Sequence, residues 1–420
     1  AIKGETVRLR IVKVTGAAVY AIIDELLVPS PSRIAPDCPH YGKCGGCALR
    51  HMSYEEELRF KLERVNDAYA HIGLLPLRAS EVIGADKTDG YRNKVIYAVD
   101  SDGVCGFFRP RSHDIVPVSR CLLQPEKADR AVRAVSRFMR ENGVPAYDEK
   151  TGTGLVRHIF IRCGMRSGEM LVTVSANGGF GALTQKLVES VRDACPDVTG
   201  IILNVNKSRG NTVLSGSFYT LWGSSVMSDE LCGLHFSLSP ASFYQINPAQ
   251  AEKLYAKALE LAAPDGRGLV LDLYCGAGTI SLCLARGAER VIGAEIVPEA
   301  VENARENAEK NGVENVEFIC ADAGQAAAEL AARKLRPRAV VVDPPRKGLS
   351  ELVIDSVCRM SPERVVYVSC NPATQARDLA VFASRGYSPV KAVAVDMFPR
   401  TAHVETVVIL SRETNPLTVE

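Results

Sequence analysis

The sequence lacks the features that would assign it to a membrane, secreted or repetitive class of protein. No apolar run reaches about 18 residues, the rough minimum for a membrane-spanning helix, and no apolar signal segment follows a basic start. Internal repeats and low-complexity tracts are also absent. We therefore expect a cytoplasmic globular protein with no membrane partner.

The sequence also lacks an excess of either sign of charge, because its 50 basic and 49 acidic residues leave a net charge of +1. A nucleic-acid surface would therefore have to come from local clustering of basic residues. The 13 cysteines are odd in number and scattered, which argues against a secreted disulfide framework. A chain of 420 residues, 46% of them hydrophobic, predicts two or three domains with buried cores.

The patterning divides the chain into three predicted domains. Residues 1–37 alternate as short strands, and fit either a partial OB-like (TRAM-like) β-barrel or a hairpin appendage. Because the strand pattern begins almost at Ala1, we expect an N-terminal segment to be missing. Residues 38–232 predict an α+β central domain, including a helix capped by Ser53 with Glu56 in a capping box. Residues 233–420 alternate strands and helices, which predicts a Rossmann-like domain with a parallel sheet, and so an α/β fold class.

A nucleoside site is predicted at the ends of four strands in the last domain. The first strand enters a glycine turn at Gly276, and the next ends in Glu295, 19 residues later, at a spacing suited to ribose hydroxyls. The following strands end in Asp322, which could reach an adenine, and Asp343, and Asp272 is grouped with them as the acid that the first strand end offers. The turn lacks the third glycine of a dinucleotide fingerprint, and no phosphate-gripping lysine follows it. S-adenosylmethionine, a nucleoside without phosphates, fits these features.

Two further residues suggest covalent methyl-transfer chemistry. Carbon 5 of uracil is a poor nucleophile until a thiolate adds at carbon 6, and a base must later remove the carbon-5 proton. Cys370 ends a predicted strand on the cofactor rim, and Glu405 lies in the final apolar strand. The alternatives are a buried inert cysteine and an edge-strand surface charge. RNA 5-methylcytosine enzymes use a cysteine in this loop, whereas no cysteine follows Pro344-Pro345 here. Amino-group methyltransferases carry an aromatic residue after the two prolines, where this chain has Arg346. Uracil is therefore the expected target rather than cytosine.

Five segments together resemble the bacterial RNA 5-methyluridine methyltransferases, especially the 23S ribosomal-RNA branch. They are FYQIN at 243–247, DLYCGAG at 272–278, DPPRKG at 343–348, VSCNPAT at 368–374 and HVE at 403–405. The resemblance implies cofactor contacts from Gln245, Tyr274, Glu295 and Asp343, with Cys370 as nucleophile and Glu405 as base. Thr279 and Asp322 depart from the family, where relatives often carry asparagine, so their assignment is weaker.

Cys38, Cys44 and Cys47 lie within ten residues among glycines, and Cys121 follows far downstream. Such a set can wrap one metal centre, either zinc or an iron–sulfur cluster, although the spacing lacks the paired knuckles of a zinc ribbon. The family resemblance implies a [4Fe–4S] cluster on these four cysteines. Because methyl transfer consumes no electrons, the cluster would be structural.

RNA contacts are expected where cations and aromatic residues interleave. Arg92 and Lys94 in the loop 90–94 fit this pattern, and His158 lies in a basic stripe with Arg157 and Arg162. A solvated strand face would look the same. The predicted function is methylation of a uridine in 23S ribosomal RNA, and the protein is expected to be a monomer. The rivals are a transfer-RNA uracil-5-methyltransferase, which commonly lacks the four cysteines, and an inactive RNA-binding iron–sulfur protein.

Overall fold

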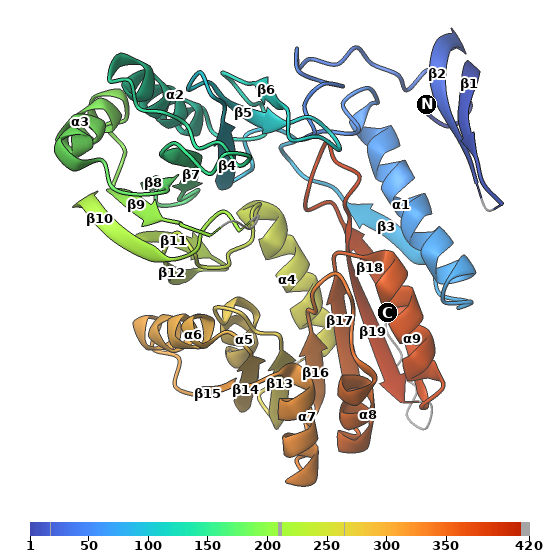
Figure 1. Ribbon diagram of the computed structural model, residues 1–420. Helices are drawn as coiled ribbons and strands as arrows, with labels where there is room; N and C mark the ends of the chain where they lie inside the picture. The colour runs from blue at the N-terminus through green and yellow to red at the C-terminus, as the bar shows by residue number, and fades with distance from the viewer. Residues whose placement is uncertain (17, 209–211, 264, 413–420) are drawn as a thin grey trace.

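Two large sheets organise the molecule, whose computed structural model describes residues 1–16, 18–208, 212–263 and 265–412. The sheet of the central unit has seven strands in the order β10-β9-β8-β7-β4-β5-β6 (Figure 1). Its strands are β4 (Lys94–Val99), β5 (Cys105–Phe108), β6 (Ile115–Pro117), β7 (Val156–Cys163), β8 (Met170–Ala176), β9 (Gly200–Val205) and β10 (Ser217–Gly223). Helices α2 (Glu126–Glu141) and α3 (Thr184–Ala194) pack on one face of this sheet.

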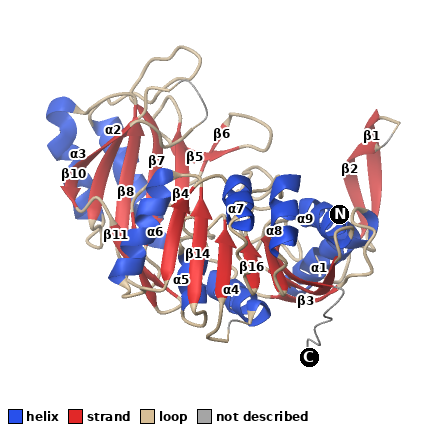
Figure 2. Cartoon of the chain, turned by 90° about the horizontal axis from the view of Figure 1, so that it is seen from below, coloured by secondary structure: helices blue, strands red, loops and turns tan. Residues whose placement is uncertain are grey.

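The C-terminal unit is built on an eight-stranded sheet in the order β15-β14-β13-β16-β17-β19-β18-β3. Figure 2 shows strands of this sheet, among them β14 and β16, lying between helices on either side. Five neighbouring strands are parallel, namely β13 (Leu269–Leu273), β14 (Arg290–Glu295), β15 (Val316–Cys320), β16 (Ala339–Val342) and β17 (Arg364–Ser369). Beyond them, β19 (Glu405–Arg412) runs antiparallel to both β17 and β18 (Tyr387–Val395). The order reverses direction between β13 and β16, which is where open α/β sheets bind ligands.

Helices cover both faces of this sheet, so the predicted Rossmann-like architecture is confirmed. One buried cluster joins the sheet to α4 (Pro248–Ala262), α5 (Thr279–Ala285) and α6 (Pro298–Lys310). The other joins it to α1 (Tyr54–His71), α7 (Ala323–Ala332), α8 (Glu351–Met360) and α9 (Pro372–Ala383). The central strand β16 is buried along its whole length, because both faces of the sheet are covered, and its sequence is a continuous apolar run.

Local signals explain where α1 begins, although one part of the predicted cap is wrong. The Ser53 side chain accepts a hydrogen bond from the Glu56 backbone N–H at 3.3 Å, as an N-cap should. The Glu56 carboxylate does not complete the capping box. It accepts instead from Arg59 at 2.6 Å, one turn along the helix, because an ion pair competes for its oxygens.

The first residues form a hairpin of β1 (Thr6–Val14) and β2 (Val19–Val28) that stands apart from the rest of the chain (Figure 1). Within the described residues, these two strands pair only with each other, and nearly all their side chains are exposed. Of the two interpretations of this segment, the structure therefore has the hairpin. The short β11 (Met227–Leu231) and β12 (Leu234–Leu238) form a second hairpin, between the two large sheets.

The predicted boundary at residue 232 does not fully separate the residues of the two large sheets. Strand β3 (Ala79–Ile83) pairs in parallel with β18 at the edge of the C-terminal sheet, and α1 packs against the same unit. Residues 54–83 thus belong with the C-terminal sheet, although they precede the central one in sequence. None of the helices in the described ranges is long and apolar enough to cross a membrane.

Candidate active site

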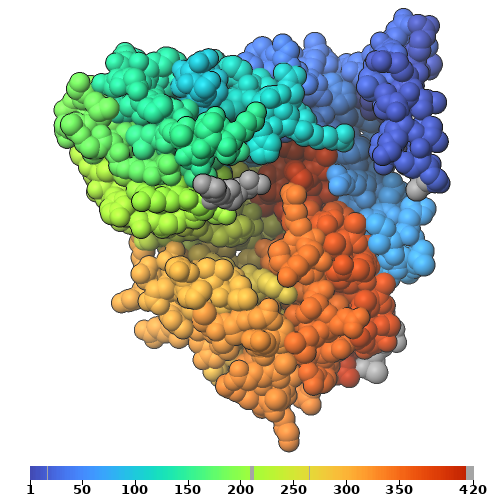
Figure 3. Space-filling model, viewed as in Figure 1, coloured from blue at the N-terminus to red at the C-terminus, as the bar shows by residue number. Residues whose placement is uncertain are grey.

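A cavity of about 1310 Å³ opens at the carboxyl edge of the C-terminal sheet, between that sheet and the central unit. The surface is hollowed between the yellow-green and orange parts of the chain (Figure 3). All the predicted catalytic and cofactor residues line this cavity: Gln245, Tyr274, Gly276, Glu295, Asp322, Asp343, Cys370 and Glu405. They come from seven different strand ends or loops, so the fold brings them together across 160 residues of sequence.

Strand order explains why the nucleophile and base candidates are neighbours. Strands β17 and β19 are antiparallel, and their register pairs Ser369 with Thr406. The next residues outward, Cys370 and Glu405, therefore lie side by side at the same edge of the sheet. Asp343 follows β16, the neighbour of β17 on the other side. The backbone pairing of the sheet thus sets the order of these three residues.

Burial gives these three groups unusual acidities. Loss of solvent raises the pKa of Glu405 to about 8, Asp343 adds to that rise, and Arg346 opposes it. Asp343 has a pKa of about 7, raised by burial and by Asp272. The pKa of the Cys370 thiol is also raised, first by burial and then by Glu405 and Asp343, whereas Arg346 lowers it. The site therefore holds protons at neutral pH and contains one cation that favours the thiolate.

The loop after Asp343 is braced against the loop after Cys370. The Arg346 carbonyl accepts from Asn371 Nδ2 at 3.0 Å and from Thr374 Oγ1 at 3.1 Å. Gly348 has a φ of +79°, and a Cβ there would lie 2.4 Å from Asp378, so only glycine fits. These contacts fix the distance between the two loops that bear the acid and the thiol. Sequence reasoning used Arg346 only to exclude an aromatic residue and missed its place beside Cys370.

The glycine turn after β13 presents backbone to the cavity. Tyr274, Gly276 and Gly278 have φ angles of +73°, +55° and +81°, so the chain turns through the left-handed region three times. The Glu295 carboxylate accepts from the Gly276 N–H at 3.1 Å and from the Val297 N–H at 2.9 Å. Each oxygen retains a lone pair, so the carboxylate is held in place and can still accept from a ribose.

Two other acids at this edge have structural roles. Asp322 caps α7, where its Oδ1 accepts from Gly324 N at 2.9 Å, and it also lines the cavity. Asp272 does not line the cavity, so its grouping with the other strand-end acids is wrong. It is fully buried and accepts from Ser281 Oγ at 2.5 Å, because it lies inside β13 rather than at its end.

The opposite wall is the segment 239–247, which carries Gln245. The Phe243 side chain is 60% exposed yet faces the cavity, where an aromatic ring can stack on a planar ligand. Asn93 anchors this wall to the central unit, since its Nδ2 donates to the Gln245 carbonyl at 2.8 Å. The next residue, Lys94, reaches into the same cavity, and burial lowers its pKa to about 8.

The other basic residues singled out from the sequence lie outside the cavity. Arg157 and Arg162 are buried, and the prediction that they belong to an RNA-facing stripe is wrong. Arg162 donates to the Ser242 carbonyl at 2.6 Å and so supports the cavity wall. His158 is half-buried on β7, and its Nδ1 has no hydrogen-bond partner among the described residues. Arg92 is half-buried beside the cysteine segment, where it lowers the pKa of Cys121.

Three of the four cysteines of the predicted cluster have raised pKa values, and the fourth contributes to two of them. Burial raises the pKa of Cys44, Cys47 and Cys121, and a nearby thiol adds to each rise: Cys38 for Cys44 and Cys47, and Cys47 for Cys121. The Gly46 N–H donates to Cys44 Sγ at 3.3 Å. Among the residues that the structure describes, no three His, Cys, Asp or Glu side chains are arranged closely enough to hold a metal ion.

A buried ion network that the sequence did not reveal supports the loop before Glu405. Lys61, on α1, donates to Asp396 at 2.6 Å, to Glu57 at 2.7 Å and to the Phe398 carbonyl at 3.2 Å. All three charged side chains are completely buried. Glu57 also accepts from the Arg400 N–H at 2.7 Å, so α1 holds the loop at two points.

Comparisons with known proteins agree with this geometry. The sequence profile of the family tRNA (Uracil-5-)-methyltransferase matches residues 227–413. An uncharacterized RNA methyltransferase of Clostridium acetobutylicum is 40% identical over 418 residues, 98% of this chain and 91% of the relative. One of Halalkalibacterium halodurans is 40% identical over 414 residues, 98% of this chain and 90% of the relative.

A solved structure extends the likeness to the fold of nearly the whole chain. It is the tRNA (uracil-54, C5)-methyltransferase of Pyrococcus abyssi in complex with S-adenosyl-L-homocysteine. Its TM-score is 0.77 at 29% identity, covering 97% of this chain and 92% of that one. The chain therefore belongs to the RNA uracil-5-methyltransferase family, whose members are S-adenosylmethionine-dependent enzymes.

Proposed function

We propose that this enzyme methylates carbon 5 of a uridine in 23S ribosomal RNA, with Cys370 as nucleophile and Glu405 as base. The observation that carries the proposal is the antiparallel register that sets Cys370 beside Glu405 on the wall of one cavity. S-adenosylmethionine, when bound along the strand ends, supplies the methyl group. Gly276, Tyr274, Glu295, Asp322 and Gln245 line the part of the cavity that would hold it.

The residues divide the reaction into two covalent stages. The Cys370 sulfur adds to carbon 6 of the uracil, and the electron pair moves toward carbon 5, which then takes the methyl group. Glu405 afterwards accepts the carbon-5 proton; the carbon-6–sulfur bond breaks, and the thiolate leaves. Arg346 favours the thiolate at both ends of this cycle, since it is the nearby cation that lowers the pKa of Cys370.

Lys94 is proposed to meet the target nucleotide. It lines the cavity from the central unit, and with a pKa of about 8 it is still mostly charged at neutral pH. An ammonium there can contact a carbonyl of the uracil ring or its phosphate. The uridine must leave its stack to reach Cys370, so contacts from both units are needed around it. Arg92 and His158 lie farther out and are proposed only as contacts to flanking RNA.

We propose a [4Fe–4S] cluster on Cys38, Cys44, Cys47 and Cys121. The proximity of the four thiols and the Gly46 N–H donated to Cys44 support it, because backbone N–H groups commonly stabilise cluster sulfurs. The cluster would join the segment 38–47 to the central sheet near Cys121. The arrangement of the thiols would have to tighten around the metal.

A transfer-RNA substrate is the second candidate. The matching family profile and the Pyrococcus abyssi structure both bear transfer-RNA names. The four cysteines favour ribosomal RNA, in line with the family resemblance. Ribosomal and transfer RNA from a strain lacking the gene decide between them. Both are incubated with the enzyme and S-adenosylmethionine, and 5-methyluridine is located by mass mapping.

The expected result is 5-methyluridine in 23S ribosomal RNA with the wild-type enzyme and none with Cys370→Ala. Methylation confined to transfer RNA would establish the second candidate instead. Product from Cys370→Ala would refute the nucleophilic mechanism, whatever the RNA.

A further inference from the structure

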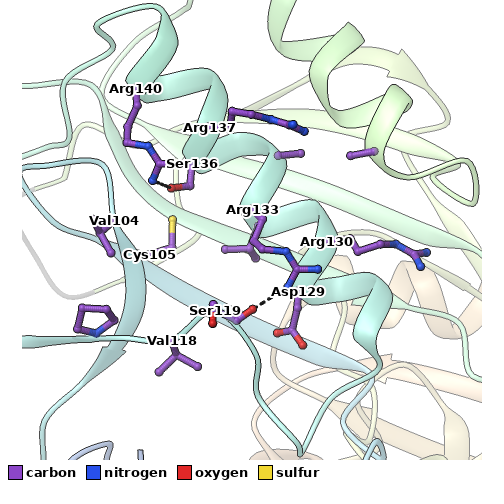
Figure 4. Close-up of a pocket in the computed structure, with 14 residues that line it drawn as sticks. Val104, Cys105, Val118, Ser119, Asp129, Arg130, Arg133, Ser136, Arg137 and Arg140 are labelled. Carbon is purple, nitrogen blue, oxygen red and sulfur yellow. Dashed lines mark hydrogen bonds between the residues drawn. The ribbon is translucent and has the colours of Figure 1, made fainter.

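A second groove lies on the central unit, on the side of its sheet turned away from the catalytic cavity. It has a volume of about 540 Å³ and runs between helix α2 and the strands β5 and β6 (Figure 4). Helix α2 packs on the face of the sheet formed by Ile159, Ile161 and Val174. Leu171 and Ile202 point to the opposite face, where they join the C-terminal core. The α2 groove is therefore a site separate from the catalytic one.

Four arginines from α2 line this groove. Arg130, Arg133, Arg137 and Arg140 are spaced three, four and three residues apart, so they share one face of the helix. Figure 4 shows the four side chains leaving consecutive turns of α2. The helix rises roughly 1.5 Å per residue, so the row from the first to the last extends about 15 Å.

Most of this positive charge has no acidic partner. Arg130 pairs with Asp197 at 3.4 Å. Arg133 and Arg140 donate to neutral oxygens, the Ser119 carbonyl at 2.7 Å and Ser136 Oγ at 3.1 Å. Arg137 has no hydrogen-bond or ion-pair partner in the part of the chain that the structure describes. In a chain of net charge +1, three exposed arginines without ion pairs on one helix face are a strong local excess.

The carboxylate within the groove does not cancel this excess. Asp129 is 1% exposed and lies beneath the arginines. Its oxygens accept from Tyr97 at 2.8 Å and from the Cys121 N–H at 3.3 Å, so it is engaged with the interior of the central unit. At most one neighbouring guanidinium is compensated by it.

We propose that the α2 groove binds the phosphate backbone of the RNA substrate at a distance from the target uridine. Guanidinium groups match phosphate oxygens with paired N–H donors, and a row of them on a concave surface follows one strand. With phosphates about 3.4 Å apart along a strand axis, the row spans roughly four of them. The proposal rests on the proposed function only in taking RNA as the substrate. Such contacts add affinity and leave the chemistry to the catalytic cavity.

The test removes two of the unpaired charges. In Arg137→Gln/Arg140→Gln, both side chains are exposed and neither contacts the catalytic cavity. The matched control, Arg290→Gln/Arg333→Gln, removes the same charge from exposed, ion-paired arginines of the C-terminal unit. Binding of unmodified 23S ribosomal RNA and of unmodified transfer RNA is measured by filter retention across a salt series, alongside methylation kinetics.

Each phosphate contact contributes a slope of about −0.7 for a single strand and about −0.9 for a duplex to the dependence of log affinity on log salt. The double variant should therefore lose about 1.4 to 1.8 units of slope and bind roughly 25- to 60-fold more weakly at about 0.1 M salt, with no loss near 1 M. KM for RNA should rise with kcat unchanged. The charge-retaining Arg137→Lys/Arg140→Lys should restore the slope, and the control variant should behave as the wild type.

A slope and affinity equal to those of the control would overturn the proposal, as would a fall in kcat without a change in KM. The two proposals fail separately. If the wild type methylates neither RNA, the proposed function is lost. If the wild type methylates one of them and the double variant binds that RNA normally, only the α2 groove is lost.

Discussion

Replacing Glu405 by glutamine should separate the two covalent stages of the reaction. Glutamine keeps the size of the side chain but cannot accept a proton as a carboxylate does. Cys370 should still add to carbon 6, and the methyl group should still be transferred, after which the enzyme stalls. Removing a general base typically lowers the rate by about a hundred- to ten-thousand-fold, so a methylated RNA–protein adduct should accumulate.

The raised pKa of Glu405 predicts how the rate of product release depends on pH. The pKa of Glu405 is raised to about 8, so the folded enzyme keeps this group protonated to a higher pH than an ordinary glutamate. The active, ionised form is then roughly a tenth of the enzyme at pH 7 and is gained as the pH rises. Release of product from the wild-type adduct should increase about tenfold per pH unit below pH 8 and level off above it.

The assay is a single-turnover reaction with labelled S-adenosylmethionine, sampled on denaturing gels between about pH 6 and 9. Glu405→Gln should form the adduct and lose the pH-dependent limb of release. Glu295→Gln is the matched control: it alters a carboxylate on the cofactor side of the cavity and should weaken cofactor binding without trapping adduct. Normal product release by Glu405→Gln would place the base elsewhere. Adduct trapped only without cofactor would refute the order of steps.

Three further predictions follow from other parts of the structure. Asp343→Asn should weaken S-adenosylmethionine binding in calorimetry and move the release limb to lower pH, because Asp343 helps to raise the pKa of Glu405; an unchanged affinity and pH profile would remove it from the site. Cys121→Ser should lose iron in anaerobically purified protein; stoichiometric zinc without iron in the wild type would refute the cluster. Lys61→Met leaves two buried carboxylates without their cation and should lower the free energy of unfolding by about 3–5 kcal/mol in denaturant titrations. Burial already raises the pKa of Glu57, so this loss of unfolding free energy relative to the wild type should be smaller at pH 5 than at pH 8. An equal loss at both pH values would contradict the prediction.

The parts of the site that depend on strand ends could be predicted from the sequence. The sequence predicts strands that end at Glu295, Asp343 and Cys370, and the structure ends them at Glu295, Val342 and Ser369, within one residue. The agreement arises because buried parallel strands are continuous apolar runs bounded by turns. Ligand sites of such sheets lie at these ends, so the residues that follow them gather in one cavity. The prediction that Asp272 belongs to the ligand site is wrong because its position inside β13 directs the side chain into the core.

The basic residues could not be sorted by pattern, since exposure of an arginine depends on what lies across the sheet. Arg162 stands on a strand like any surface cation, yet the segment 239–247 folds over it and takes its hydrogen bonds. The arginines of α2 have a clearer helical period, but a charged helix face usually indicates no more than contact with solvent. Only the groove beside them makes the distinction.

The loop before Glu405 shows why position in the site depends on residues far away in the chain. This segment between β18 and β19 has no regular hydrogen bonding to fix it, yet Phe398 and His403 from it line the cavity. Lys61 reaches it across 335 residues of sequence, and the Tyr91 hydroxyl donates to the Pro399 carbonyl at 3.0 Å across 308. In sequence, Lys61 is one charge among many on a polar helix. Burial gives Lys61 its role, because its ammonium is enclosed with the carboxylates of Glu57 and Asp396. The ion pairs therefore tie helix α1 to the loop that carries Asp396. The base is therefore positioned on one side by the sheet and on the other by a helix that the sequence assigns to another domain.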